Sequence, residues 1–537
     1  MVLQIFTLAL LFWIHVLADA QVVVDTRNGK VGGHWMTSRG GRQFLAFLKI
    51  PYAIPPIGSY RFKPPVEIDS WSDIKNETEP GPRCLQYNTY EIKPKVIGVE
   101  NCLYLAVYTH NTTSRNAVMI HLHGGGFFGG TGPRRTEPHY MMDEDVVIVD
   151  INYRLGFLGF LSFEDKEMPG NQGLKDQVLA MKWVQKNIAK FGGDPNKVTL
   201  VGESAGAGSA YHHTVSPMSR GLFHRAIAES GTSYNPWGVA PPGHAKATAK
   251  KLAKNLGCPT KTTSEAVSCL LKKNASDIAS SLETFKVWQI DTGIIWPCLE
   301  PPGPDAFLTG PVSKWQHNPV PLMLGTTSGE GLLRTGYFLY YKLDFKWFSD
   351  NFDKLGPLSL KYSETASNPA EVSKKLRDYY FSGGDITADS WFNLTQMYTD
   401  SWFAIGIIDG ANYHTGDTYF YYFDYIGENT WWKNTSRTYF FGAPHTEEMN
   451  FIWQNPYANW THEGDDLKFS KRLVKIWTDF AKFGNPAPKG CDLSWAKWDP
   501  RRHNYLMMSN SGFEQKEGFA KDRYNFWKSF NFRNNIK

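Results

Sequence analysis

A serine between two glycines is the first group in this sequence that could do chemistry. The string Gly202-Glu203-Ser204-Ala205-Gly206 directly follows residues 197–202 (KVTLVG), an apolar run that predicts a buried strand. A segment that can be helical comes next. A sharp strand-to-helix turn requires small neighbours and exposes the serine side chain at the end of the strand. The pattern predicts that Ser204 is a nucleophile, whereas the same string in another context would be an ordinary turn.

A run of glycines upstream could stabilise the charge that such a nucleophile creates. His123-Gly124-Gly125-Gly126-Phe127 comes at the end of residues 117–123 (AVMIHLH), another predicted strand. Attack on a carbonyl group places negative charge on its oxygen, and each preorganised backbone N–H group lowers that barrier by about 3 kcal/mol. We expect the amides of Gly125, Gly126 and Ala205 to form this oxyanion hole.

A serine nucleophile also needs a base to take its proton and an acid to orient the base. For a serine on a strand-to-helix turn, the chain order is serine, acid, histidine. Glu330 is the expected acid, because it lies in a turn that follows the predicted strand 320–325. His445 is the expected base, because GAPHTEE (442–448) is a rigid loop beyond the predicted strand 418–424. A structural role for His445 is the alternative. Three other histidines follow Glu330 in the chain: His414, His462 and His503.

Short apolar, β-rich runs alternate with helical patterns along the chain. This alternation is typical of a mostly parallel sheet covered by helices on both faces. Further strands are expected at 145–151 and 226–229, and helices at 173–191 and near 466–483. Because no repeat or linker divides the chain, we expect an α/β fold in which residues 21–537 form a single domain around a large, mostly parallel central sheet flanked by helices.

Composition and charge exclude several classes of protein. The 537 residues are 42% hydrophobic and 15% aromatic, which supplies a large core and excludes a disordered chain. The 57 basic and 52 acidic residues give a net charge of +5, too balanced over this length for a nucleic-acid-binding protein. The Lys-rich stretch 244–256 is interpreted as a solvated helix face rather than a membrane-surface helix. We expect no cofactor and no metal, since the six cysteines form no C-x-x-C pair.

The beginning of the chain predicts export. Residues 2–18 form an uncharged apolar run, and Ala18-Asp19-Ala20 is suitable for cleavage before Gln21. We therefore expect residues 1–20 to be a secretory signal peptide, with an uncleaved membrane anchor as the alternative. The polar, basic C-terminal segment argues against a membrane span or lipid anchor there. The expected product is secreted, extracellular and not associated with a membrane.

Sequons and cysteines agree with export. Six N-x-[ST] sequons are candidate glycosylation sites, although several are expected by chance in this length: Asn76, Asn111, Asn274, Asn393, Asn434 and Asn459. In an oxidising compartment, cysteines near one another in sequence can pair, and two intervals suit this: Cys84 with Cys102 and Cys258 with Cys269. The remaining two, Cys298 and Cys491, are either paired with each other or free.

These motifs resemble the type-B carboxylesterase and cholinesterase family of α/β-hydrolases, and within it the secreted insect carboxylesterases. The likeness covers nearly all of residues 22–530, and its main stretches are 51–65, 100–108, 121–130, 152–162, 170–210 and 442–449. The resemblance implies an α/β-hydrolase fold, a triad of Ser204, Glu330 and His445, and the oxyanion hole named above. It also implies both disulfides and two structural ion pairs, Arg61 with Glu100 and Arg154 with Asp176.

Departures from the family pattern bear on the substrate. The loop 85–101 contains no tryptophan, so the stacking partner that cholinesterases offer to choline is missing there. Glu203 stands where juvenile hormone esterases typically have Gln. Residues 294–302 (IIWPCLEPP) replace the usual acyl-pocket region and place Cys298 in it.

The sequence as a whole predicts a secreted serine carboxylesterase that hydrolyses small, uncharged carboxylic esters through an acyl-enzyme, in detoxification or in hormone or odorant ester turnover. One alternative is a juvenile hormone esterase. Another is a non-catalytic or scavenging cholinesterase-like binding protein, and a third is a lipase. The oligomeric state does not follow from the sequence.

Overall fold

A computed structural model describes residues 22–88, 94–287, 295–340, 342–430, 442–456, 460–530 and 532. The expected signal peptide, residues 1–20, and the sequons at Asn434 and Asn459 lie outside these described residues. Among the described helices, none has the length and apolar character needed to cross a membrane.

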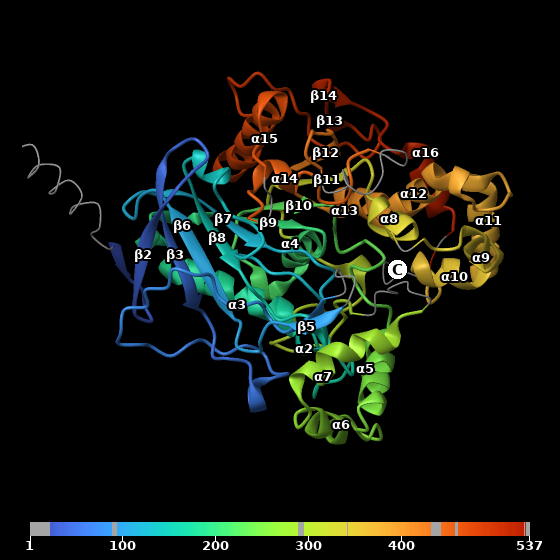
Figure 1. Cartoon of the computed structure of the whole chain (residues 1–537), viewed down its shortest axis with the longest axis horizontal. Helices are drawn as coiled ribbons and strands as arrows, with labels where there is room; N and C mark the ends of the chain where they lie inside the picture. Colours follow the sequence, from blue (N-terminus) through green and yellow to red (C-terminus); the bar gives the residue numbers. More distant parts are fainter. Residues whose placement is uncertain are drawn as a thin grey trace, which may run out of the picture.

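A large twisted sheet runs through the molecule (Figure 1). It has 12 strands in the order β1-β2-β3-β6-β8-β7-β9-β10-β11-β12-β13-β14. Pairing is parallel from β8 through β13 and antiparallel towards both edges. Its strands are β1 Val22–Asp25, β2 Lys30–Thr37, β3 Gln43–Pro51, β6 Tyr104–Thr109, β7 Asn116–Leu122, β8 Val146–Ile151, β9 Gly193–Glu203, β10 Arg225–Glu229, β11 Leu322–Thr327, β12 Thr418–Asp424, β13 Tyr505–Ser509 and β14 Gly512–Lys516. The α/β fold with a mostly parallel sheet is confirmed.

Both faces of the sheet are covered, because its strands are apolar on both sides. In β7, Val118, Ile120 and Leu122 pack with α3 and α4, while Ala117 and Met119 pack in a second core with α15. This is the period-two alternation of a strand buried on both faces. The covering helices are α2 Gly156–Phe160, α3 Gln172–Asn187, α4 Ala205–Val215, α13 Ile405–Tyr413, α14 Met449–Ile452, α15 Gly464–Phe483 and α16 Lys521–Lys528.

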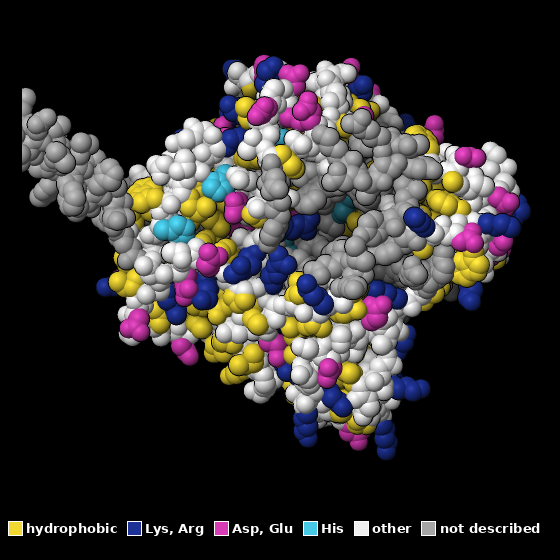
Figure 2. All heavy atoms as spheres, in the orientation of Figure 1, with side chains coloured by type: hydrophobic (Ala, Val, Ile, Leu, Met, Phe, Trp, Pro, Cys, Tyr) yellow, Lys and Arg dark blue, Asp and Glu magenta, His cyan; other side chains and the backbone are white. Residues whose placement is uncertain are grey.

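Two further groups of helices project beyond the sheet (Figure 1). One consists of α5 His244–Asn255, α6 Thr263–Leu270 and α7 Ala275–Ser280. The other surrounds a third apolar cluster and consists of α8 Leu332–Tyr340, α9 Phe345–Asp350, α10 Phe352–Ser359, α11 Pro369–Phe381 and α12 Trp391–Thr399. Lysines gather at the tip of the α5–α7 group (Figure 2), where α5 buries Ala249 and Leu252 and exposes its lysines, as expected for a solvated helix.

Three predicted elements differ clearly in their boundaries. The strand predicted at 197–202 is β9, which begins four residues earlier, because Gly193 pairs with Asn116 of β7. The helix predicted at 173–191 is α-helical only to Asn187; residues 188–191 form a tighter 3₁₀ turn that ends at Gly192, whose φ is +79°. The strand predicted at 320–325 begins at Leu322 and continues to Thr327. Pro321 explains the later start, because proline has no N–H group to donate to a neighbouring strand.

The disulfides and ion pairs implied by the resemblance are present. Cys84 is bonded to Cys102 and Cys258 to Cys269, while Cys298 is free and buried and Cys491 is free and exposed. Arg154 forms a buried ion pair of 2.6 Å with Asp176, and Arg61 lies 2.6 Å from Glu100. The four described sequons are exposed: Asn76, Asn111, Asn274 and Asn393.

Candidate active site

Ser204 occupies a strained turn between β9 and α4. Its φ is +58° and its ψ is −120°, a region that residues other than glycine rarely adopt. The N–H group of Ser204 donates to the carbonyl of Glu229, at 2.8 Å, on the neighbouring strand β10. A Cβ atom on Gly206 would lie only 1.8 Å from the carbonyl oxygen of Leu122, so a larger residue does not fit. The predicted strand–turn–helix geometry is therefore present at Ser204.

Glu330 and His445 are 115 positions apart in the sequence and contact each other in the structure. The Nδ1 atom of His445 is hydrogen-bonded to Oε2 of Glu330, whose side chain is fully buried. The loop that carries His445 is fixed beside that of Glu330, because the N–H group of Gly329 donates to the carbonyl of Ala443 at 2.7 Å. With Nδ1 engaged, Nε2 of His445 is the nitrogen left for chemistry, and it is buried without a hydrogen-bond partner in the described part of the chain.

The other oxygen of Glu330 is held by three donors. Oε1 accepts hydrogen bonds from the hydroxyl groups of Ser230, at 2.5 Å, and Thr326, at 2.9 Å, and from the N–H group of Thr327, at 2.8 Å. Burial alone would raise the pKa of Glu330, but His445 and the hydrogen bonds from Ser230 and the N–H group of Thr327 lower it below its ordinary value. Glu330 is therefore an anion with a fixed orientation at neutral pH.

The sheet explains why these groups share one edge. Glu203 at the end of β9 pairs with Glu229 at the end of β10, and Glu229 pairs with Gly325 in β11. Ser204 therefore follows the carboxyl end of β9 and Glu330 that of β11, the two parallel strands on either side of β10. The carboxyl ends of parallel strands are where α/β folds carry their sites. In the described residues, no hydrogen bond joins Ser204 to His445, so the structure places both groups at this edge without linking them directly.

The glycine loop after β7 lies against Ser204. A Cβ atom on Gly124 would be 3.1 Å from Cβ of Ser204. Gly125 and Gly126 have φ angles of +111° and +61°, so the loop depends on glycine at both positions. Among the hydrogen bonds of the described residues, none has the N–H group of Gly125 or Gly126 as its donor. These amides are therefore available to an oxyanion.

The remaining histidine candidates have structural roles. Each places a ring nitrogen within hydrogen-bonding distance of a backbone carbonyl: His414 with Val320, His462 with Asn450 and His503 with Phe519. Sequence reasoning missed Ser230, which supports Glu330. The signal that could have found it is its place directly after the predicted strand 226–229, at the same sheet edge as Ser204.

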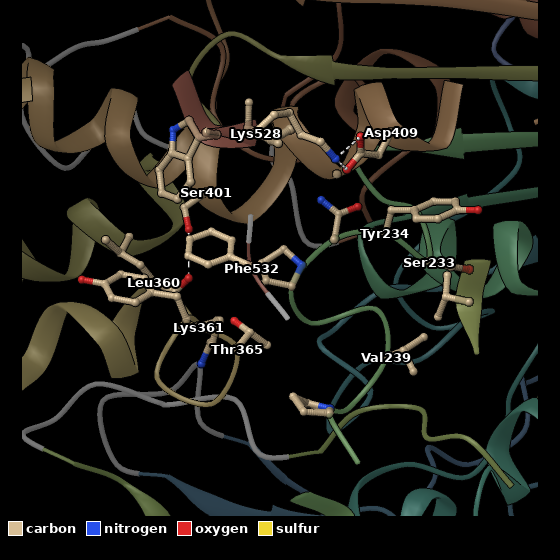
Figure 3. A pocket seen from close by; sticks show the side chains of 18 of the residues that line it. Ser233, Tyr234, Val239, Leu360, Lys361, Thr365, Ser401, Asp409, Lys528 and Phe532 are labelled. Atoms are coloured by element: carbon tan, nitrogen blue, oxygen red, sulfur yellow. Dashed lines mark hydrogen bonds and ion pairs between the residues drawn. The ribbon is translucent and has the colours of Figure 1, made fainter. Parts of the chain in front are cut away.

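A cavity of about 350 Å³ lies between α13, α16 and the segments 233–241 and 360–365 (Figure 3). Its walls include Leu360, Lys361, Ser401 and the Asp409–Lys528 ion pair, whose atoms are 3.0 Å apart. Phe403 belongs to the same π-helical turn as Ser401, residues 400–404, but its ring contacts His445 with centroids 4.5 Å apart. None of the expected triad residues lines the cavity, so it is distinct from the place where we expect bond cleavage.

Comparisons with known proteins agree with this geometry. The carboxylesterase family model matches residues 20–527. The chain is 34% identical to esterase FE4 of Myzus persicae, over 95% of this chain and 93% of that protein, and 34% identical to juvenile hormone esterase of Tribolium castaneum, over 92% and 87%. The crystal structure of juvenile hormone esterase from Manduca sexta with OTFP covalently attached superposes with a TM-score of 0.83 at 27% identity, covering 95% of this chain and 99% of that one. This chain belongs to the carboxylesterase family and is a carboxylic-ester hydrolase.

Proposed function

We propose that the protein is a secreted serine carboxylesterase that hydrolyses small, uncharged esters through an acyl-enzyme on Ser204. One observation carries this proposal. The buried Glu330–His445 pair leaves only Nε2 of His445 available, at the sheet edge where Ser204 occupies a strained strand-to-helix turn.

The reaction follows from the groups at this edge. Nε2 of His445 accepts the proton of Ser204 Oγ as Oγ bonds to the ester carbonyl carbon. The tetrahedral intermediate collapses, the bond to the alkoxy oxygen breaks, and His445 returns the proton to the leaving alcohol. Water then attacks the acyl-enzyme, again giving a proton to His445, and the carboxylic acid leaves as Oγ recovers that proton.

Glu330 acts through His445 and does not take up a proton. Its carboxylate fixes the ring with Nδ1–H towards Oε2, so that Nε2 is unprotonated before the reaction begins. It then stabilises the imidazolium ion that forms in each step. Ser230 and Thr326 keep the carboxylate in place.

The oxyanion is stabilised by the amides of Gly125, Gly126 and Ala205. We expect Gly125→Ala to reduce kcat/KM for a nitrophenyl ester by about 10² to 10³-fold, because the added Cβ would lie 2.1 Å from the carbonyl oxygen of Gly129 and displace the loop. Steady-state kinetics and a thermal melt measure the effect. Gly303→Ala is the matched control, since no atom lies within 4 Å of its added Cβ. Retention of activity within threefold in Gly125→Ala would remove this loop from the mechanism.

The surroundings favour an uncharged ester. Three buried aromatic rings contact one another beside the catalytic edge, from Phe127 to Trp237 at 6.3 Å and from Trp237 to Phe403 at 6.0 Å. Trp237 lies close to the nucleophile's backbone: a Cβ atom added to Gly231 would be 2.8 Å from the ring of Trp237 and 2.5 Å from the carbonyl oxygen of Ser204. The loop 85–101 has no tryptophan, so the stacking partner that cholinesterases offer to choline is missing there.

An isosteric pair of esters tests this preference. We expect kcat/KM for 3,3-dimethylbutyl acetate to exceed that for acetylcholine by at least about tenfold, because the quaternary ammonium would lose hydration without the loop tryptophan that stacks on it in cholinesterases. Both rates are measured by titration of the released acid, and a cholinesterase assayed alongside serves as the control with the opposite preference. Equal rates, or faster turnover of acetylcholine, would contradict the proposed substrate class.

Juvenile hormone esterase activity is the second candidate, favoured by the similarity to the juvenile hormone esterases of Tribolium castaneum and Manduca sexta. Glu203 argues against it, because juvenile hormone esterases typically have Gln at this position. A juvenile-hormone analogue belongs in the same ester series.

Secretion is supported by the N-terminal apolar run, the disulfides, the exposed sequons and the similarity to venom carboxylesterase-6 of Apis mellifera. We also infer that residues 21–537 form one catalytic domain after removal of residues 1–20.

A further inference from the structure

A buried histidine lies between two carboxylates directly behind the nucleophile. His121, in β7, has its Nδ1 atom 3.1 Å from Oδ1 of Asp150 and its Nε2 atom 3.0 Å from Oε2 of Glu203. Asp150 belongs to the neighbouring strand β8, where it pairs with His121, and Glu203 is the last residue of β9. All three side chains are at most 2% exposed. The row Asp150–His121–Glu203 therefore crosses three adjoining strands in a place without access to water.

Both ring nitrogens of His121 face a carboxylate oxygen, so the ring satisfies both contacts only when each nitrogen carries a proton. Burial alone would lower the pKa of His121, but Asp150 and Glu203 together raise it to about 10. Burial likewise opposes ionisation of Glu203, yet the hydrogen bonds from His121 and Gly124 lower its pKa to about 2. At neutral pH the ring is a cation and Glu203 is an anion.

The second oxygen of Glu203 reaches the glycine loop. Oε1 accepts a hydrogen bond of 2.7 Å from the N–H group of Gly124, the residue immediately before Gly125. Gly124 touches the nucleophile's own turn, because its Cβ position lies 2.6 Å from the carbonyl oxygen of Glu203. A single carboxylate thus connects the cation in β7 to the first amide of the loop that we expect to bind the oxyanion.

Two neighbouring side chains fix the row at Asp150 and at His121. The hydroxyl group of Thr136 donates to Oδ2 of Asp150 at 3.1 Å, and the ring of Trp453 packs on His121 with centroids 4.9 Å apart. The ring therefore cannot turn away from Glu203 without breaking other contacts. Without the cation, two buried carboxylates would face each other uncompensated, which strongly disfavours this arrangement.

We propose that His121 is a positioning residue: it holds Glu203 so that Oε1 fixes the amide of Gly124, and with it the oxyanion loop, against Ser204. This inference rests on the proposed esterase function and adds His121 and Asp150 to the groups on which its rate depends. Its action is indirect, since His121 contacts neither the nucleophile nor the space in front of it.

A double-mutant cycle tests the inference. We expect His121→Gln to lower kcat by at least thirtyfold and to change KM by less than threefold, because oxyanion donors act in the transition state. Glu203→Gln keeps an oxygen that accepts from Gly124, so it should stay within tenfold of the parent. The double variant should match Glu203→Gln within threefold, because His121 acts on the glycine loop only through the carboxylate of Glu203. In Glu203→Asp the side chain is one methylene group shorter and no longer reaches the N–H group of Gly124. This variant should therefore show the same loss of kcat as His121→Gln, although His121 is intact.

His213→Gln is the matched control for burial. His213 is also buried, and its ring nitrogens lie 2.7 Å from Ser219 Oγ and 2.9 Å from Gln177 Oε1. The His213→Gln variant should lose thermal stability, as His121→Gln does, but its kcat should stay within threefold of the parent. The inference is overturned if His121→Gln keeps its kcat, or if the two single losses multiply in the double variant. Failure of the esterase function itself looks different, because the parent protein would then neither hydrolyse esters nor react with a phosphonyl fluoride at Ser204.

Discussion

Replacing Ser204 with alanine is expected to reduce kcat on short-chain nitrophenyl or naphthyl esters by about a millionfold, as in the best-documented serine hydrolase. The reason is that Oγ is the only atom of the turn that forms the covalent bond, so no acyl-enzyme can form without it. Binding should survive, because the glycine loop and the Glu330–His445 pair do not depend on the hydroxyl group. KM or an inhibition constant for a substrate-like ketone should therefore change little.

Ser209→Ala is the matched control for this substitution. Ser209 lies in the same helix α4, is fully buried, and donates its hydroxyl hydrogen bond to the carbonyl of Ala205 at 2.9 Å. The substitution removes this side-chain hydrogen bond and the one that Ser209 Oγ accepts from Nε2 of Gln177 at 3.2 Å, but no backbone hydrogen bond of the helix. Activity should therefore stay within about threefold of the parent. If Ser204→Ala keeps its turnover within tenfold of the parent, Ser204 is not the nucleophile.

Glu330→Gln is expected to produce the second largest effect, a loss of about 10⁴-fold in kcat with KM nearly unchanged. An amide of the same shape can present an N–H group to Nδ1, which would place the ring proton on Nε2, the wrong nitrogen for a base. It also supplies no negative charge to the imidazolium ion. Folding should be retained, since Ser230 and Thr326 can still donate to an amide oxygen.

Steady-state kinetics with a thermal melt separates this effect from general destabilisation. Asp466→Asn is a suitable control, because Asp466 is also buried and accepts hydrogen bonds from the hydroxyl group of Tyr425, at 2.7 Å, and the N–H group of Glu428, at 2.9 Å. That variant should lose stability and keep its kcat. A Glu330→Gln enzyme with a kcat within tenfold of the parent would contradict the role given to Glu330.

The fold could be predicted because its signals are local. Runs such as residues 117–123 and 145–151 are mostly apolar, which is typical of strands buried on both faces, and they correspond to β7 and β8 within one residue at each end. The expected triad was predictable for a related reason. Ser204, Glu330 and His445 each follow such a run, and the ends of parallel strands meet at one edge of a sheet.

What could not be predicted depends on contacts between distant residues. His121 lies inside an apolar run, so its sequence context indicates a strand residue and nothing more. Its partners Asp150 and Glu203 are 29 and 82 positions away, and only the order of β8, β7 and β9 in the sheet brings them together. Ser230 was hidden in the same way, since its partner Glu330 is 100 positions away. Whether Cys298 and Cys491 pair with each other could not be predicted, because no local pattern indicates it. In the structure both are free, Cys298 buried and Cys491 exposed.

Covalent labelling with a phosphonyl fluoride, followed by peptide mass spectrometry, tests the central claim most directly. We expect one equivalent of phosphonyl group on the peptide that contains Ser204, with ester hydrolysis lost in proportion to labelling. The same treatment of Ser204→Ala should give no adduct. An adduct on another residue, or full loss of activity with Ser204 unmodified, would show that the reaction does not proceed through an acyl-enzyme on Ser204.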